Sequence, residues 1–247
     1  MLFRSVSSAG YTLLYSTLNN TIRPSNGHRV LLSQDFAGIG GNVRYLRTRI
    51  SGGKYWSIGR GFILSLTGEG GAIIPFEDAA PGVDPIRLND RFTLGSPQIR
   101  GFDIRGVGPR VVRRPYAIGT DGTPTLDSNG AFTYVEDDQQ RRDEAIGGRY
   151  YYLARLELEL PLGQGVSQLG VRPSAFLDVG ALWGVRRPNL LNIEPGSDLT
   201  RLQCQATDGT ISVQPIGGNS CPEGSQIFRF GTAPFREFFF GDTPTPR

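Results

Sequence analysis

The chain has 247 residues, enough to bury a core, and 38% of them are hydrophobic. Glycine (34), proline (17), phenylalanine (14) and tyrosine (9) are abundant, which favours strands and turns over helices. No apolar run approaches the roughly 18 residues of a membrane-spanning helix, and a net charge of +3 from interleaved arginines and carboxylates indicates no nucleic-acid partner.

Four strands are predicted in the first third of the chain, where apolar and polar side chains alternate. They cover residues 11–19, 29–39, 42–58 and 62–74. Asn26-Gly27 is expected to reverse the chain between the first two strands, and His28 beside it is expected to be a solvent-facing turn residue. Ser51-Gly52-Gly53 lies inside the third strand, where glycine often marks a bulge, and a bulge is predicted there.

Alternation then disappears between about residues 75 and 147, far beyond the roughly 12–15 residues at which unstructured loops become rare and usually functional. Within this stretch, residues 91–110 place glycines among arginines and aromatics. A phosphate-binding loop is disfavoured because GxxxxGK[ST] is absent, and Phe92 and Phe102 argue against a disordered surface loop. The remaining interpretation is a plug-like loop, folded into a polar interior and held there by Arg100, whose guanidinium presents a planar fork of donors.

Two further strands follow at residues 150–162 and 171–183. Leu156 and Leu158 share one face of the first strand, and Arg155, Glu157 and Glu159 share the other. In the second strand Ser174, Phe176 and Asp178 oppose Ala175 and Leu177, and Trp183 at the end is placed where an interfacial aromatic belt would lie. Glu157, Glu159 and Asp178 are therefore candidate partners for Arg100.

The last segment, residues 184–247, is polar and rich in proline, and a second long loop is predicted. Its two cysteines, Cys204 and Cys221, lack the CxxC or histidine spacing of a metal site. A loop disulfide is favoured, which would fit an oxidising compartment, with two unpaired thiols as the alternative. No metal and no cofactor are expected.

Six antiparallel strands predict an all-β fold, an antiparallel transmembrane β-barrel. Bacterial barrels have at least eight strands, and open edges are not tolerated in hydrocarbon. The barrel is therefore expected to be incomplete, with residues 1–247 forming a partial outer-membrane domain that the loops at 75–147 and 184–247 interrupt. Residues 1–8 show no signal peptide, so the start is expected to be missing.

The long loop resembles the [VIL]RGF motif loop of the bacterial surface antigen superfamily. The matching residues are Arg91, Phe92, Gly95, Ile99, Arg100, Gly101, Phe102, Gly108 and Pro109. Ile99 replaces the commoner valine, and Ser96 stands where glycine is common. The resemblance implies a sixteen-stranded barrel, with POTRA domains and terminal strands absent from this chain. It also implies that Arg100 bonds to acidic residues on the two following strands, here Glu157 and Asp178.

The resemblance implies a non-enzymatic part of the machinery that folds and inserts β-barrel proteins into the bacterial outer membrane. The implied partners are unfolded outer-membrane proteins, assembly-complex lipoproteins and outer-membrane lipids. The alternative within the superfamily is a polypeptide translocator of the TamA or two-partner secretion type. A patatin-like lipase would need a GxSxG motif, which is absent, and a soluble β-sandwich adhesin would need polar outward faces instead of rows of leucine.

Overall fold

The computed structural model of the chain describes residues 7–38, 43–79, 83–120, 123–161, 172–214 and 220–241. These residues form two compact units. The first contains residues 1–109, 145–187 and 241–247, and the second contains residues 110–144 and 188–240. Strands are the main regular secondary structure of both units. No helix among the described residues is long and apolar enough to cross a membrane.

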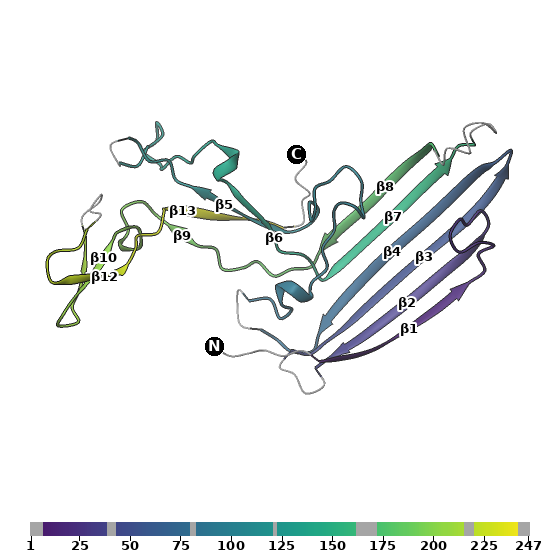
Figure 1. The fold of residues 1–247 in the computed structure, drawn as a ribbon, viewed down its shortest axis with the longest axis horizontal. Coiled ribbons are helices and arrows are strands. Elements are labelled where there is room, and N and C mark those ends of the chain that lie inside the picture. The colour runs from purple at the N-terminus through teal and green to yellow at the C-terminus, as the bar shows by residue number, and fades with distance from the viewer. Residues whose placement is uncertain are drawn as a thin grey trace. The chain divides into compact units, whose positions relative to one another are not determined.

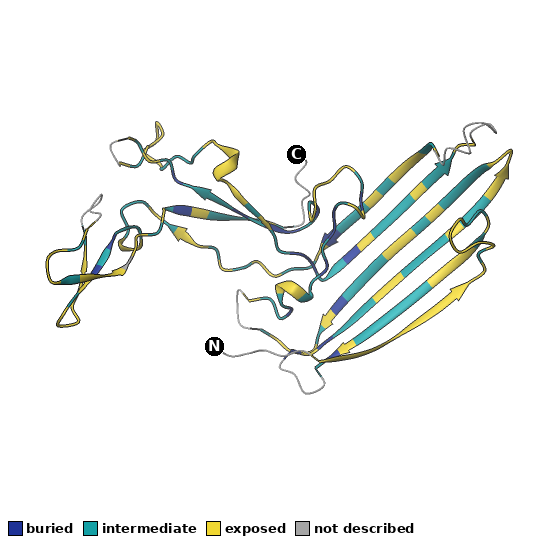
Figure 2. Cartoon of the chain, in the orientation of Figure 1, coloured by how far each residue is buried: buried dark blue, intermediate teal, exposed yellow. Residues whose placement is uncertain are grey.

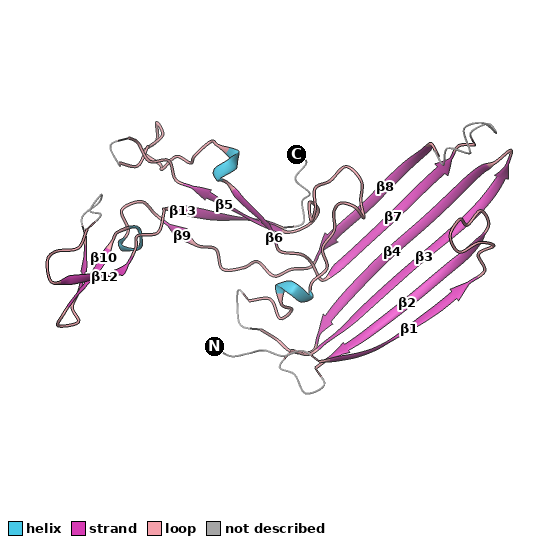
Figure 3. Ribbon diagram, viewed as in Figure 1, coloured by secondary structure: helices cyan, strands magenta, loops and turns pink. Residues whose placement is uncertain are grey.

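The first unit is built on one antiparallel sheet of six strands in the order β1-β2-β3-β4-β7-β8 (Figures 1 and 3). The all-β antiparallel fold class is thereby confirmed. The strands are β1 (Ser8–Ser16), β2 (Gly27–Ala37), β3 (Tyr45–Gly59), β4 (Phe62–Pro75), β7 (Tyr150–Glu159) and β8 (Ser174–Trp183). Their ends lie within three residues of the predicted ones, and the predicted end residues 39, 42, 162 and 171 lie outside the described residues.

The bulge predicted at Ser51-Gly52-Gly53 was wrong. These residues pair without interruption to both neighbouring strands, for example Gly52 with Val30 and with Gly68, and the register shifts only between Ser57 and Gly59, beside the hairpin. A Cβ on Gly52 would meet no atom closer than 3.5 Å. The glycines lie in a regularly paired strand and only reduce its side-chain volume. Glycine inside a strand therefore does not by itself identify a bulge.

The two faces of the six-stranded sheet differ in chemistry. Cross-strand pairing aligns Thr67, Arg155 and Asp178 in one row, and we call the face that carries this row the loop face. The opposite side, the outer face, carries rows of exposed apolar residues, including Val30, Leu66, Leu156, Leu177 and Val179. Exposed positions recur along the strands of this sheet (Figure 2). An exposed apolar face of this extent fits a sheet that borders hydrocarbon.

The core of the first unit lies where the long loop covers the loop face. It consists of Ala37, Val43, Tyr45, Ile73, Ile86, Phe92, Leu94, Ile99, Val107, Tyr151 and Leu182, with Leu153 packed against it. Part of this core comes from the sheet and part from residues 86–107, so the loop and the sheet bury each other.

The second unit corrects the prediction of two irregular loops. It contains a four-stranded sheet, in the order β6-β5-β13-β9, and a three-stranded sheet, in the order β11-β10-β12. The strands are β5 (Arg110–Pro115), β6 (Arg142–Ala145), β9 (Asn192–Ile193), β10 (Gln203–Ala206), β11 (Ile211–Val213), β12 (Ser225–Arg229) and β13 (Phe235–Phe240). Short 3-10 helices η1 (Leu88–Asp90), η2 (Asp138–Gln140) and η3 (Asp198–Thr200) lie between strands. Strands of two to six residues are too short to show a period, and β5 pairs with β13 from more than a hundred residues away.

Candidate functional site

The motif loop, residues 91–109, is an ordered structure pinned at its base. Bridges join Phe92 to Gly148 and Leu94 to Val107. Within the loop, the amide of Ser96 donates to the carbonyl of Asp103 (3.1 Å). A Cβ on Gly95 would lie 2.4 Å from that same carbonyl oxygen, so only glycine fits there. The motif glycine thus serves the close approach of two backbone segments.

The base of the loop packs on the sheet through apolar and aromatic side chains. The rings of Phe92 and Tyr151 lie 4.6 Å apart between centroids, and Leu94 and Ile99 are almost fully buried. Gly108 lies so close to Leu182 that a Cβ would come within 2.6 Å of its side chain. This packing determines the position along β7 and β8 at which the tip of the loop contacts these strands.

Arg100 projects from the tip of the loop to Asp178 on β8. Its Nε donates to Oδ2 at 3.0 Å, its second guanidinium nitrogen donates to Oδ1 at 3.1 Å, and its backbone amide donates to Oδ2 at 3.2 Å. On β7, the nearer oxygen of Glu157 lies 3.6 Å from the guanidinium. The guanidinium carbon also lies 3.2 Å from the ring centroid of Phe176. Arg100 therefore contacts both strands and an aromatic face.

Arg155, which sequence reasoning did not single out, is the second cation of this site. It is the cross-strand neighbour of Asp178, and its Nε donates to Oδ1 of that carboxylate at 2.8 Å. The same guanidinium donates to the carbonyl of Gln98 in the motif loop at 2.8 Å. Its alternation with Leu156 places it on the loop face, but only the register shows that it faces Asp178.

We call Arg100, Arg155, Glu157 and Asp178 the arginine clamp. Two guanidinium groups and two carboxylates balance in charge, and the side chain of Asp178 is only 4% exposed. Hydrogen bonding to Asp178 raises the pKa of Arg100 above its ordinary value, against a smaller lowering by desolvation. Such a cluster is stabilised by its charge-assisted hydrogen bonds as long as every member is present.

Arg91 holds the root of the loop at a second polar junction. Its guanidinium donates to the carbonyls of Ile86 (3.0 Å) and Ile146 (2.9 Å), which lie before and after the loop. Asp84, with a side chain 2% exposed, lies 3.8 Å from Arg91 and accepts the backbone amide of Arg186 at 2.9 Å. Burial lowers the pKa of Arg91, and the charge of Asp84 opposes that effect. The sequence did not identify Asp84, because the residues around it in the chain form no motif and no alternating pattern.

The other predicted site residues have separate places. Phe102 is 39% exposed at the tip of the loop and does not join the core, whereas Pro109 is fully buried. Gly101, next to Arg100, has φ +84°, a value that favours glycine. Glu159 pairs with Arg172 at 3.8 Å and takes no part in the clamp.

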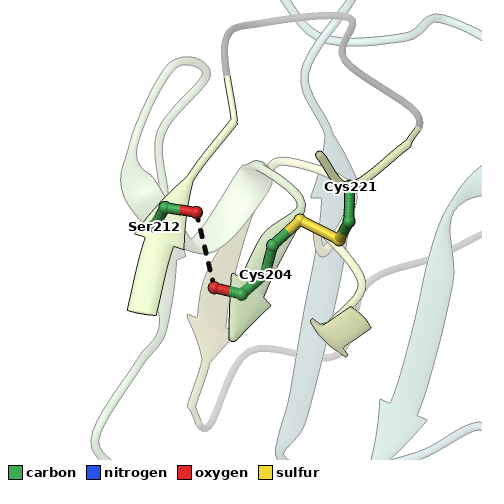
Figure 4. The surroundings of a disulfide bond; sticks show 3 residues. All are labelled: Cys204, Ser212 and Cys221. Atoms are coloured by element: carbon green, nitrogen blue, oxygen red, sulfur yellow. Dashed lines mark hydrogen bonds between the residues drawn. A yellow bond between two sulfur atoms is a disulfide. The ribbon is translucent and has the colours of Figure 1, made fainter. Parts of the chain in front are cut away.

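Cys204 and Cys221 form a disulfide in the second unit (Figure 4). Cys204 lies in β10 and is fully buried, and its carbonyl accepts the hydroxyl of Ser212 from β11 at 3.5 Å. The bond ties the segment after β11 to the middle of the three-stranded sheet.

The sequence profile of the Omp85 superfamily domain matches residues 3–194. The chain belongs to the Omp85 superfamily. The match contains the whole motif loop and all six strands of the first sheet, and the resemblance to the bacterial surface antigen superfamily is confirmed by it.

Relatives of this Omp85 chain include the outer membrane protein assembly factor BamA of Neorickettsia risticii (strain Illinois), 30% identical over 181 residues. That alignment covers 73% of this chain and 20% of the relative. The human sorting and assembly machinery component 50 homolog is 25% identical over 182 residues, which is 71% of this chain and 31% of the relative. The chain therefore spans less than a third of each of these proteins.

A crystal structure of BamA from Haemophilus ducreyi, lacking POTRA domains 1–3, has a similar fold. Its TM-score is 0.52 at 18% identity, and the match covers 95% of this chain and 42% of that one. At this identity the likeness supports the fold alone. The open six-stranded sheet thus corresponds in fold to part of a BamA barrel.

Proposed function

We propose that this Omp85 chain is part of the machinery that folds and inserts β-barrel proteins into the bacterial outer membrane. The observation that carries the proposal is the arginine clamp, through which the motif loop holds β7 and β8 together from the loop face. The names of its relatives, an assembly factor and a sorting and assembly component, support the same activity. The proposed role is non-enzymatic.

In this proposal the arginine clamp holds β7 and β8 in a fixed register. The loop is tied to β8 through Asp178 and to β7 through Glu157 and Arg155, so the two strands cannot shift in register without breaking charged hydrogen bonds. In this proposal β7 and β8 form the part of the barrel wall that stays fixed. The proposed partners are unfolded outer-membrane proteins, assembly-complex lipoproteins and the lipids against the outer face.

The bacterial outer membrane, in preference to a mitochondrial one, is supported by the stronger bacterial match. The Neorickettsia protein is 30% identical over 73% of this chain, whereas the sorting and assembly machinery component 50 homologs are either 30% identical over 42% of it or 25–29% identical over 71–79% of it.

The test replaces Arg100 in the complete gene product, expressed in cells depleted of their own assembly factor. Arg100→Ala removes the cation from Asp178 and Glu157, and Arg100→Lys keeps the charge but loses the two-pronged geometry. We expect the folded, heat-modifiable forms of resident outer-membrane β-barrel proteins to fall sharply with alanine and partly with lysine. Arg44→Ala, which removes an exposed ion pair with Glu77, is the matched control.

Unchanged client folding in the Arg100→Ala cells, at normal levels of the variant protein, would contradict the proposal. A translocator gives a different pattern, because one exported polypeptide would accumulate while the resident barrel proteins fold normally.

A further inference from the structure

The outer face carries a cluster of polar and aromatic side chains at the end of the sheet where β1 turns into β2 and β3 turns into β4. Its members are Tyr15, His28, Lys54 and Trp56, and we call it the rim cluster. His28 and Lys54 are direct cross-strand partners, and the rings of Tyr15 and His28 lie 5.5 Å apart. His28 is exposed, as predicted, but belongs to β2 instead of the turn, and Thr17 Oγ1 lies 3.0 Å from its Nδ1.

Lys54 is the only lysine of the chain. Its ammonium lies 5.2 Å from the ring centroid of Trp56, two residues nearer the β3–β4 turn. Lys54 is exposed, and a lysine beside apolar surface can lay its methylene stem along that surface while its charge reaches the polar boundary. No carboxylate among the described residues forms an ion pair with it.

The rows next to the rim cluster are apolar. Lys54 is followed across the sheet by Leu66, Leu156 and Leu177, which are exposed. Exposed apolar residues lie on both sides of Lys54 along β3, at Ile50 and Ile58, so the anion that suits this cation in a membrane is one that is itself attached to hydrocarbon. Of the anions a membrane offers, the phosphate of a phospholipid headgroup meets both conditions, with its acyl chains along the leucine rows.

We propose that the rim cluster binds the phosphate of a phospholipid headgroup, in the leaflet at the hairpin end of the strands. Lys54 supplies the charge, the Trp56 indole and the Tyr15 ring lie at headgroup level, and Nε2 of His28, which no described residue engages, supplies a further polar contact. The proposal rests on the membrane location in the proposed function. A single cation favours an anionic lipid, because a zwitterionic headgroup brings a competing positive charge.

The experiment uses Trp56 as the reporter. The chain contains two tryptophans, so Trp183→Phe in the complete gene product removes the other tryptophan of this segment; any tryptophan outside residues 1–247 is replaced as well. The protein is folded into phosphatidylcholine vesicles that contain a minor fraction of headgroup spin-labelled phosphatidylglycerol or, separately, spin-labelled phosphatidylcholine. We expect phosphatidylglycerol to be preferred about fivefold, which corresponds to about 1 kcal/mol for one lysine at a membrane surface.

Lys54→Gln should abolish the preference and Lys54→Arg should keep it. Arg29→Gln is the matched control, because Arg29 pairs with Gly53, next to Lys54, but lies on the loop face. Equal quenching by the two lipids, or a preference that survives Lys54→Gln, would overturn the proposal while leaving client folding and the membrane location intact. Absence of quenching by either lipid, as in a dimer formed through this face, would overturn the membrane location too.

Discussion

At the scale of single residues, Asp178 has the central place in the arginine clamp. It accepts hydrogen bonds from both arginines and from the Arg100 amide, whereas Glu157 contacts Arg100 only at 3.6 Å and also accepts the Ser174 hydroxyl at 2.6 Å. Alternation and the family resemblance together led to Arg100, Glu157 and Asp178, which the structure places in contact. They could not rank the two carboxylates, because ranking depends on distance and burial.

This asymmetry predicts unequal effects of the two carboxylates on stability. Asp178→Ala leaves Arg100 and Arg155 facing each other without their shared anion and should cost about 3 kcal/mol, as removal of one partner from a buried ionic cluster does. Glu157→Ala removes a longer contact of a side chain that is 26% exposed and should cost no more than about 1 kcal/mol. Denaturant unfolding in vesicles, followed by gel mobility, measures the loss of stability in both variants. Equal losses would show that the two carboxylates contribute equally to the clamp.

At the scale of elements, the long strands were predictable and the short ones were not. Strands of nine residues or more, such as β4 and β7, show alternation because one face contacts apolar and the other polar surroundings over their whole length. β5 and β13 are six residues each, and FREFFF in β13 has no clear alternation because its two faces both carry aromatics. Their pairing is set by tertiary contacts that the sequence does not display.

The motif loop as an element depends on a backbone crossing at Gly95. Gly95→Ala would put a methyl group 2.4 Å from the Asp103 carbonyl and 2.5 Å from the Arg105 amide, both of which are backbone atoms that cannot rotate away. We expect a loss of about 1–3 kcal/mol and faster proteolysis within residues 91–109.

Gly52→Ala provides the control for this prediction, because a methyl group there meets nothing nearer than 3.5 Å and should change stability by less than about 0.5 kcal/mol. Equal protease resistance of the two variants would show that the loop can re-fold around the added methyl group.

At the scale of the whole molecule, the two units are stabilised by different means. The first unit rests on long strand pairings and a shared apolar core, and the second rests on short strands, aromatic contacts such as Tyr116 with Tyr134, and the disulfide. The cysteine spacing favoured a disulfide from the sequence alone, but the sheet that it fastens was not foreseen.

Removal of the disulfide should therefore act locally. The cysteines are 17 residues apart, and closing a loop of this size stabilises by about 3 kcal/mol. In the double variant Cys204→Ser and Cys221→Ser, amide hydrogen exchange should accelerate in β10, β11 and β12 and stay unchanged in β3 and β4. Faster exchange throughout the six-stranded sheet would show that the two units unfold together.

The order of the six-stranded sheet has a practical consequence for any preparation of this chain by itself. Among the described residues, β1 and β8 each pair on one side only, and each offers a full row of backbone donors and acceptors along its free side. In detergent or lipid those groups have no water to satisfy them, so the free side of one molecule is a template for the free side of the next. Rings or ladders of this chain seen after purification would then be products of two unsatisfied edges, and their size would carry no information about assembly in the cell.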